Sequence, residues 1–172
     1  LVSPDHLFFP APWNTLGPGG EPELPPGRTF GATGPAAGRG VKVSIIDTGL
    51  LERPRPPELA HDLMLGPNAI ENQDYDGNGY IDDCHGIDTL NGDSNPMDDN
   101  GHGTHTAGTI GAVGNNSLGV VGVNWNVRLM PCKFLGADGS GPISAALACL
   151  DYVKTMKDRG VNIVATNNSW GN

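Results

Sequence analysis

The order of apolar segments after residue 40 constrains the fold more than any other feature of the chain. Residues 41–46 are a β-branched apolar run typical of a buried parallel strand, and the run ends at Asp47. The segments predicted to follow are a helix over residues 103–113, strands over 120–124 and 127–135, a helix over 142–159 and a strand over 161–165. Because strands alternate with helices, the sequence predicts an α/β fold that is doubly wound, with helices on both faces of a mostly parallel sheet.

The helix predicted over residues 142–159 has clear signals at both ends. Pro142 stands at its first position, Lys157 and Arg159 lie in the last turn, and Gly160 ends it. Four large apolar residues recur at helical spacing and predict the face that packs on the sheet: Ile143, Leu147, Leu150 and Val153.

Composition bounds the domain organisation and excludes some partners. Residues 1–40 hold eight prolines and eight glycines, so we expect an extended arm lying on a domain formed by residues 41–172. The formal charge of −9 argues against nucleic acid as a partner. No apolar run reaches the roughly 20 residues of a membrane-spanning helix, so no membrane partner is expected. No signal peptide begins at Leu1, so we expect either that a leader was removed or that there never was one.

The three cysteines, Cys84, Cys132 and Cys149, cannot all pair within the chain, and their spacing matches no metal motif. We interpret them mainly as small buried apolar residues. A single disulfide is the alternative, and the sequence does not choose its partners.

An acidic stretch lies in the long irregular region of residues 50–100, where one short helical turn is predicted near residues 57–61. Residues 71–99 carry nine carboxylates and no Lys or Arg. So many charges of one sign in a folded domain need a counter-charge, and a hard cation such as calcium supplies it. A loop this long is also uncommon unless it is functional or held by a ligand. We therefore predict a calcium-binding insertion over residues 71–99.

Residues 74–83 match the Asp-x-Asp-x-Asn-Gly pattern of EF-hand calcium loops, although His85 stands where the twelfth-position Glu is expected. The predicted ligands are the side chains of Asp74, Asp76 and Asn78, the carbonyl of Tyr80, and the carboxylate of Asp83 or Asp82. The alternative is a solvated acidic loop without a metal.

Asp47 and His102 are the candidate catalytic residues. A hydroxyl nucleophile at neutral pH needs a base beside it, and the base needs a partner that fixes its tautomer and stabilises its cation. An Asp at the end of a strand and a His at the start of a helix can supply these two groups. Taken alone, the Asp could equally cap a turn, and the His could equally be structural.

The chain resembles the subtilisin-like serine proteases (subtilases) in four segments: Val-Ser-Ile-Ile-Asp-Thr-Gly at 43–49, Asn-Gly-His-Gly-Thr-His-Thr-Ala-Gly at 100–108, Leu-Gly-Ala-Asp-Gly-Ser-Gly at 135–141 and Asn-Asn-Ser-Trp-Gly at 167–171. The resemblance implies a subtilisin-like fold and a serine-type endopeptidase in which Asp47 orients the general base His102, while His105 is structural. It further implies two segments that pair with an extended polypeptide substrate: Gly139, Ser140, Gly141 and Ser169, Trp170, Gly171.

In that family the nucleophilic Ser and the Asn that stabilises the oxyanion lie beyond the segment matched here. The resemblance therefore implies a carboxyl-terminal fragment that completes the fold and carries the Ser, and this chain alone is expected to be inactive. A propeptide or a protein inhibitor is a further candidate partner, and export from the cytoplasm is expected because most subtilases are secreted. The alternative is an inactive subtilase-like module that binds calcium or substrate. A nucleotide-binding domain is disfavoured because no phosphate-binding glycine motif follows a strand.

The resemblance also implies two more calcium sites. In one, Asp88 and Asp93 bind through side chains and Asn95 through its carbonyl, as in thermitase-like subtilases. In the other, the loop over residues 114–120 binds together with Glu58. That loop is one residue longer than the family pattern, so Asn116 and Asn115 are not distinguished as its ligand.

Overall fold

The computed structural model describes residues 38, 40–51, 78–81, 85–114 and 120–171. Its elements, in chain order, are β1 (Lys42–Asp47), β2 (Ile87–Asp88), α1 (His102–Gly111), β3 (Arg128–Lys133), α2 (Ile143–Asp158) and β4 (Ile163–Asn167). The four strands form one parallel sheet in the order β2-β3-β1-β4. The predicted arm over residues 1–40 and the helical turn near 57–61 lie outside the described residues, apart from positions 38 and 40.

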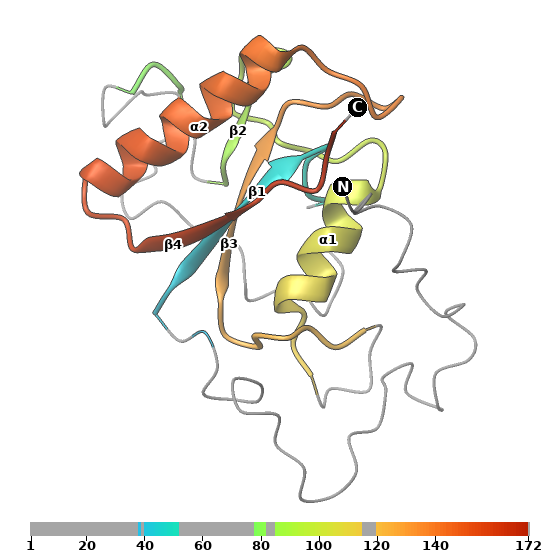
Figure 1. Cartoon of the computed structure of the whole chain (residues 1–172), viewed down its shortest axis with the longest axis vertical. Helices are drawn as coiled ribbons and strands as arrows, with labels where there is room; N and C mark the ends of the chain where they lie inside the picture. The colour runs from blue at the N-terminus through green and yellow to red at the C-terminus, as the bar shows by residue number, and fades with distance from the viewer. Residues whose placement is uncertain (1–37, 39, 52–77, 82–84, 115–119, 172) are drawn as a thin grey trace, which may run out of the picture.

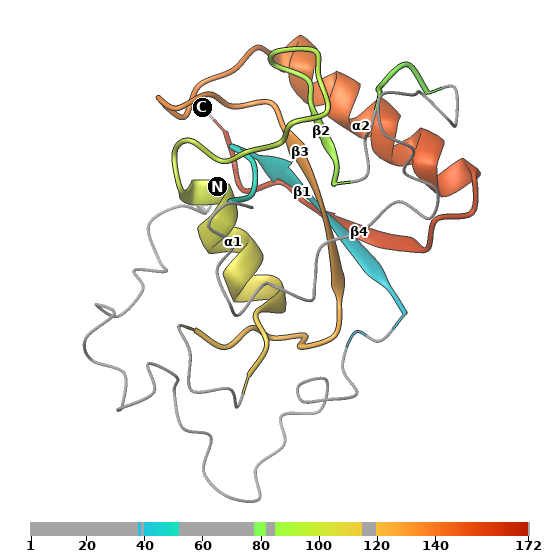
Figure 2. The same cartoon turned by 180° about the vertical axis from the view of Figure 1, so that it is seen from behind.

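The two helices cover opposite faces of this sheet (Figures 1 and 2), so the predicted α/β fold is confirmed. Because side chains alternate along a strand, neighbouring residues of β1 serve different cores. Ile45 packs with Ala107 of α1 in one cluster, whereas Ile46 packs with Cys149 of α2 in the other. The sheet therefore buries an apolar layer on each face. Asp47 is the last residue of the central strand β1, so it lies at the carboxyl end of the sheet, where both layers end.

Small residues let α1 lie close to the sheet. Gly111 leaves no room for a side chain, because a Cβ there would lie 2.8 Å from Cγ1 of Val127. The helix begins at His102 after Gly101, whose φ of 103° lies in the left-handed region that favours glycine. The prediction of a helix packed tightly on the sheet, with His102 at its amino end, is confirmed.

The face of α2 that packs on the sheet differs from the predicted one. Its buried residues are Ala145, Ala146, Cys149, Tyr152, Val153 and Met156. Of the predicted stripe only Val153 is buried, whereas the exposed fractions of Ile143 and Leu147 are 63% and 56%. The small side chains of Ala145, Ala146 and Cys149 allow close approach to the sheet in the first half of α2, and Ile143 and Leu147 lie outside the contact.

A disulfide between Cys132 of β3 and Cys149 of α2 ties the helix to the sheet, with 5.8 Å between the two Cα atoms. Both cysteines are fully buried, as the interpretation as small buried apolar residues requires, but they pair, so the alternative of a single disulfide is the one that the structure shows. Cys84 lies outside the described residues.

Residues 120–124 are not the strand that their β-branched composition predicts. Their backbone N–H groups pair with the end of α1 instead: Gly122 donates to Ala112 O at 2.9 Å, and Asn124 donates to Ile110 O at 2.9 Å. The segment thus supplies hydrogen bonds that the last carbonyls of a helix otherwise lack. Among the described helices none has the length and apolar character needed to span a membrane.

Candidate active site

The end of β1 and the start of α1 bring Asp47 and His102 together. Nδ1 of His102 lies 2.8 Å from Oδ1 of Asp47. The carboxylate is fully buried, whereas the His102 side chain is 40% exposed. Because an ionised carboxylate only accepts hydrogen bonds, the proton of the neutral imidazole belongs on Nδ1, and Nε2 keeps its lone pair. The two residues are thus arranged as an orienting carboxylate and a partly exposed base.

The hydrogen bonds of Asp47 converge on one oxygen. Its Oδ1 also accepts from the backbone N–H of Thr48 at 2.7 Å. Its Oδ2 is buried and has no hydrogen-bond partner within the part of the chain that the structure describes. The orientation of the imidazole therefore depends on a single short contact to a carboxylate that the backbone holds in place.

Asn100 joins this pair to the first predicted substrate segment. Its Oδ1 accepts from the N–H of His102 at 3.2 Å, and its Nδ2 donates to Ala137 O at 2.9 Å. The loop that follows is tight, since Gly136 N–H donates to Ser140 O and Gly139 adopts a φ of 77°. Asn100 thereby sets the distance from the start of α1 to the loop at residues 136–141.

The two predicted substrate segments both contact Phe134, one through its backbone and the other through its ring. A Cβ at Gly141 would overlap the carbonyl oxygen of Phe134, so the chain passes directly against that residue. The ring of Trp170 packs edge-on against the ring of Phe134, with centroids 4.9 Å apart. Ser169 is held by the Asn167 side chain, and Gly139, Ser140 and Gly141 are all exposed. The segments at 139–141 and 169–171 therefore border one surface.

The hydroxyl of Ser140 is engaged by its own loop. Ser140 Oγ donates to Asp138 Oδ2 at 2.7 Å, and the backbone N–H of Ser140 donates to Asp138 Oδ1 at 2.9 Å. These two bonds lower the pKa of Asp138 below its usual value. Ser140 thus shapes the loop rather than presenting a nucleophile.

Lys133 is a buried cation beneath the site that sequence reasoning missed. Its Nζ donates to Thr48 O at 2.7 Å, to Leu135 O at 2.8 Å and to Asp99 Oδ1 at 2.6 Å. The Lys133 side chain is 3% exposed. It ties the ends of β1 and β3 to the turn that precedes His102. The signal available in the sequence was a lysine that directly follows the apolar residues 129–132.

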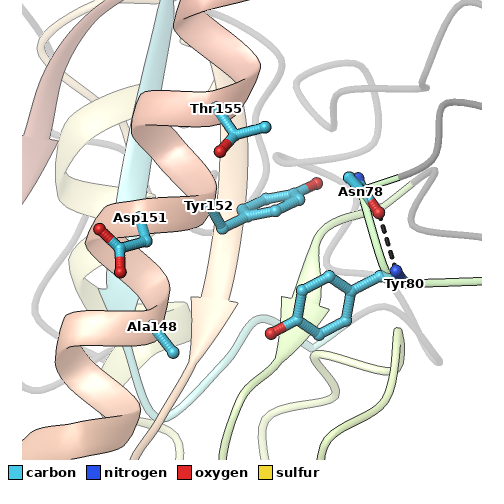
Figure 3. Close-up of a pocket in the computed structure, with 6 residues that line it drawn as sticks. All are labelled: Asn78, Tyr80, Ala148, Asp151, Tyr152 and Thr155. Carbon is cyan, nitrogen blue, oxygen red and sulfur yellow. Dashed lines mark hydrogen bonds between the residues drawn. The ribbon is translucent and has the colours of Figure 1, made fainter.

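The structure tests only part of the expected calcium ligands. Asp74, Asp76, Asp83, Glu58 and Asn116 lie outside the described residues. Asn78 Oδ1 accepts from Tyr80 N–H at 2.8 Å, which is the geometry of a tight turn. The Tyr80 ring meets Tyr152 edge-on at 5.7 Å, beside a cavity on α2 that Asp151 also lines (Figure 3).

The carboxylates of the second predicted calcium site accept hydrogen bonds from residues of their own loop. Asp88 Oδ1 accepts from Leu90 N–H and Asn91 N–H, and Asp88 Oδ2 accepts from the Asn91 amide. Asp93 Oδ1 accepts from Asn95 N–H at 2.9 Å. Over the described ranges, no three acidic, His or Cys side chains gather as a metal cluster. Calcium therefore stays a prediction.

Comparison with known proteins identifies the family of the chain. Residues 38–172 match the family model described as "Subtilase family". "Subtilisin-like protease 1" of Plasmodium falciparum (isolate 3D7) is 40% identical over 124 residues, which are 70% of this chain and 18% of that protein. "Subtilisin BL" of Lederbergia lenta is 37% identical over 115 residues, which are 67% of this chain and 33% of that protein. A crystal structure of a cold-adapted subtilisin-like serine proteinase matches with a TM-score of 0.46 at 28% identity, covering 74% of this chain and 36% of its own.

The chain spans a third or less of the length of these two relatives. Its match to the family model nevertheless runs through β1, both helices and the segments around Asp47 and His102. The chain therefore belongs to the subtilase family.

Proposed function

We propose that the chain is the amino-terminal part of the catalytic domain of a serine-type endopeptidase. In this proposal Asp47 orients the general base His102, and a carboxyl-terminal part of the domain contributes the nucleophilic Ser and the oxyanion Asn. The observation that carries the proposal is the 2.8 Å contact between His102 Nδ1 and Asp47 Oδ1.

The contact supports base catalysis in two ways. With Nδ1–H donating to Asp47, Nε2 is free to take the proton of a serine hydroxyl as that oxygen attacks the peptide carbonyl. The buried carboxylate then stabilises the imidazolium that forms, and Nε2 returns the proton to the leaving amine. His102 is 40% exposed, so a hydroxyl from another part of the protein can approach the ring.

A polypeptide substrate in this proposal lies extended between the segments at 139–141 and 169–171. Both segments border Phe134, and their glycines expose the backbone to a strand that adds alongside. Main-chain hydrogen bonds bind many sequences in this way, and pockets beside them add preference. A propeptide or a protein inhibitor would use the same surface.

Calcium binding by the acidic insertion is part of the proposal. Nine carboxylates lie within residues 71–99, a stretch without lysine or arginine. Lys133 pairs with Asp99, and a divalent cation would reduce the repulsion among the others. The candidate ligands are Asp74, Asp76, Asn78, Tyr80, Asp83, Asp88, Asp93, Asn95, Glu58 and Asn116.

Calcium loops of modest affinity suit the calcium concentration outside cells, which favours a secreted protein. Calcium should raise the melting temperature and excess chelator should lower it; an unchanged melting temperature would contradict this part.

A reconstitution experiment tests the proposed activity. The chain is combined with the carboxyl-terminal part of its domain, and the serine is labelled with a fluorophosphonate while peptide cleavage is followed. Asp47→Asn should lower kcat about 10⁴-fold, the effect seen when the orienting carboxylate of such triads is neutralised. His102→Ala should lower kcat at least as much as Asp47→Asn does. His105→Ala removes an exposed imidazole of the same helix and serves as the matched control. Absent labelling and cleavage, with calcium still bound, would favour an inactive module instead.

A further inference from the structure

We propose that Thr48 and Asp98 are positioning residues that hold His102 within hydrogen-bond distance of Asp47. The two side chains form a buried bridge between the end of β1 and the first turn of α1. The inference rests on the proposed function, in which that distance determines the activity of the base.

Thr48 makes three hydrogen bonds around Asp47 and His102. Its backbone N–H donates to Asp47 Oδ1 at 2.7 Å. Its hydroxyl accepts from the N–H of Gly103, the residue after His102, at 2.9 Å. The same hydroxyl donates to Asp98 Oδ1 at 2.8 Å. Thr48 is 1% exposed, so water does not replace these partners. One residue thus touches the orienting carboxylate and the backbone next to the base.

Asp98 accepts hydrogen bonds from the residues on both sides of His102 in the sequence. Its Oδ1 also accepts from Asn100 N–H at 3.0 Å and from Gly101 N–H at 2.8 Å. Its Oδ2 accepts from the N–H and the hydroxyl of Thr104, at 2.8 and 2.6 Å. The Thr104 hydroxyl in turn accepts from Leu51 N–H at 2.8 Å. The turn before His102 and the helix after it are thereby fixed to the chain that follows β1.

The charge on Asp98 strengthens this bridge. Burial disfavours the ionised carboxyl, but the hydrogen bonds from Thr104, Gly101 and Asn100 outweigh that cost and keep the pKa of Asp98 below its usual value. An anion near the amino end of a helix also interacts favourably with the helix dipole. Asp98 is therefore ionised at neutral pH and accepts from the five groups that surround it.

Neither side chain contacts the imidazole in the described hydrogen bonds, so their effect on the base is indirect. Rigid placement matters because a displacement of about 1 Å can cost a catalytic group about 100-fold in rate. Loss of the bridge would let the start of α1 move relative to β1. The Asp47–His102 contact would lengthen, while the segment at 169–171, whose Trp170 packs on the ring of Phe134, would remain in place.

The test replaces Thr48 by Val, which keeps the shape and removes the hydroxyl, and by Ser, which keeps the hydroxyl. In the completed protease, Thr48→Val should lower kcat about 10–100-fold and change KM much less. The kcat of Thr48→Ser should stay within about threefold of that of the wild type. Thr109→Val is the matched control, because the Thr109 hydroxyl is exposed and bonds to His105 O of its own helix. A Ser variant as impaired as the Val variant would overturn the proposal, as would a Val variant with unchanged kcat.

A second measurement needs no proteolysis and so separates this inference from the proposed function. In proton NMR of the chain, the His102 Nδ1–H bonded to Asp47 should give a far-downfield resonance. Thr48→Val and Asp98→Asn should broaden it or shift it upfield, while Thr48→Ser and Thr109→Val retain it. An unchanged resonance in folded Thr48→Val would refute the bridge even if the domain proves to be a protease.

Should both Thr48→Val and Asp98→Asn fail to fold, hydrogen exchange in the wild-type chain decides the question. The His102 ring proton and the Gly103 amide should lose protection together in urea below the unfolding midpoint. Independent loss of the two protections would contradict the proposal.

Discussion

Lys133→Met should strongly destabilise the chain, because Met keeps most of the aliphatic stem and removes the ammonium. The ammonium satisfies the carbonyl oxygens of Thr48 and Leu135 in an environment where the lysine side chain is only 3% exposed. Each buried acceptor left without a donor costs about 1–3 kcal/mol. The third partner, Asp99, is 52% exposed and regains water, so we assign it no cost. Loss of the donor to both carbonyls should lower the free energy of unfolding by about 2–6 kcal/mol.

The cost of burying the ammonium moves the expected loss toward the lower half of that range. A buried charge carries a desolvation penalty that the wild type bears and the variant escapes. We therefore expect a loss of about 3 kcal/mol, measured by urea denaturation with calcium present and with an unchanged m-value.

Lys154→Met is the matched control for this prediction. The Lys154 side chain is 73% exposed and pairs with Asp158 on the surface of α2, so the same substitution should leave the urea midpoint where it is. If Lys133→Met lowers the unfolding free energy by less than about 1 kcal/mol relative to this control, the two bonds to buried carbonyls do not stabilise the site as argued.

Three further predictions follow from the described contacts. The pKa of Asp98 is lowered in the folded state, so the ionised carboxylate should contribute fully to stability near neutrality, and this contribution should be lost as pH falls below about 4. Asp98→Asn should abolish that part of the pH dependence in denaturation curves measured from about pH 7 downward. Replacing both Cys132 and Cys149 by Ala should lower the unfolding free energy by about 3 kcal/mol, and a reductant should then have no further effect on the melting temperature. Gly86→Ala should lower the melting temperature far more than Gly92→Ala. Both glycines have positive φ, but of these two only Gly86 lies so close to a backbone carbonyl that a Cβ would overlap it. Equal decreases in melting temperature would show that the positive φ alone accounts for the destabilisation.

The strand end at Asp47 and the helix start at His102 were predictable from local signals, whereas their pairing as orienting carboxylate and base rested on the resemblance to subtilases. A β-branched run ends at Asp47, and a run of small residues follows His102, so the strand end and the helix start are both visible in the sequence. Parallel topology then places them at the same edge of the sheet. Their 2.8 Å separation is what the structure adds.

The errors concern packing that periodicity does not report. Residues 120–124 have a composition typical of a strand, yet their N–H groups bond to the end of α1. The predicted face of α2 was wrong because helical spacing of large residues says nothing about how closely a helix approaches its sheet. Ala145 and Ala146 occupy that contact, and Leu147 does not. Lys133 was missed because its partners are two carbonyls and an aspartate that only the fold brings together.

The central position of β1 has a consequence for synthesis of the chain. Its neighbour β3 lies far along the sequence, since Ser44 pairs with Met130 at a separation of 86 residues. At about 5–20 residues per second, a ribosome needs roughly 4–17 s to supply that neighbour, and longer to supply β4. During that interval the apolar strand that ends at Asp47 has neither of its partners. We therefore expect the nascent chain to need shielding of this strand until β3 and β4 have been synthesised.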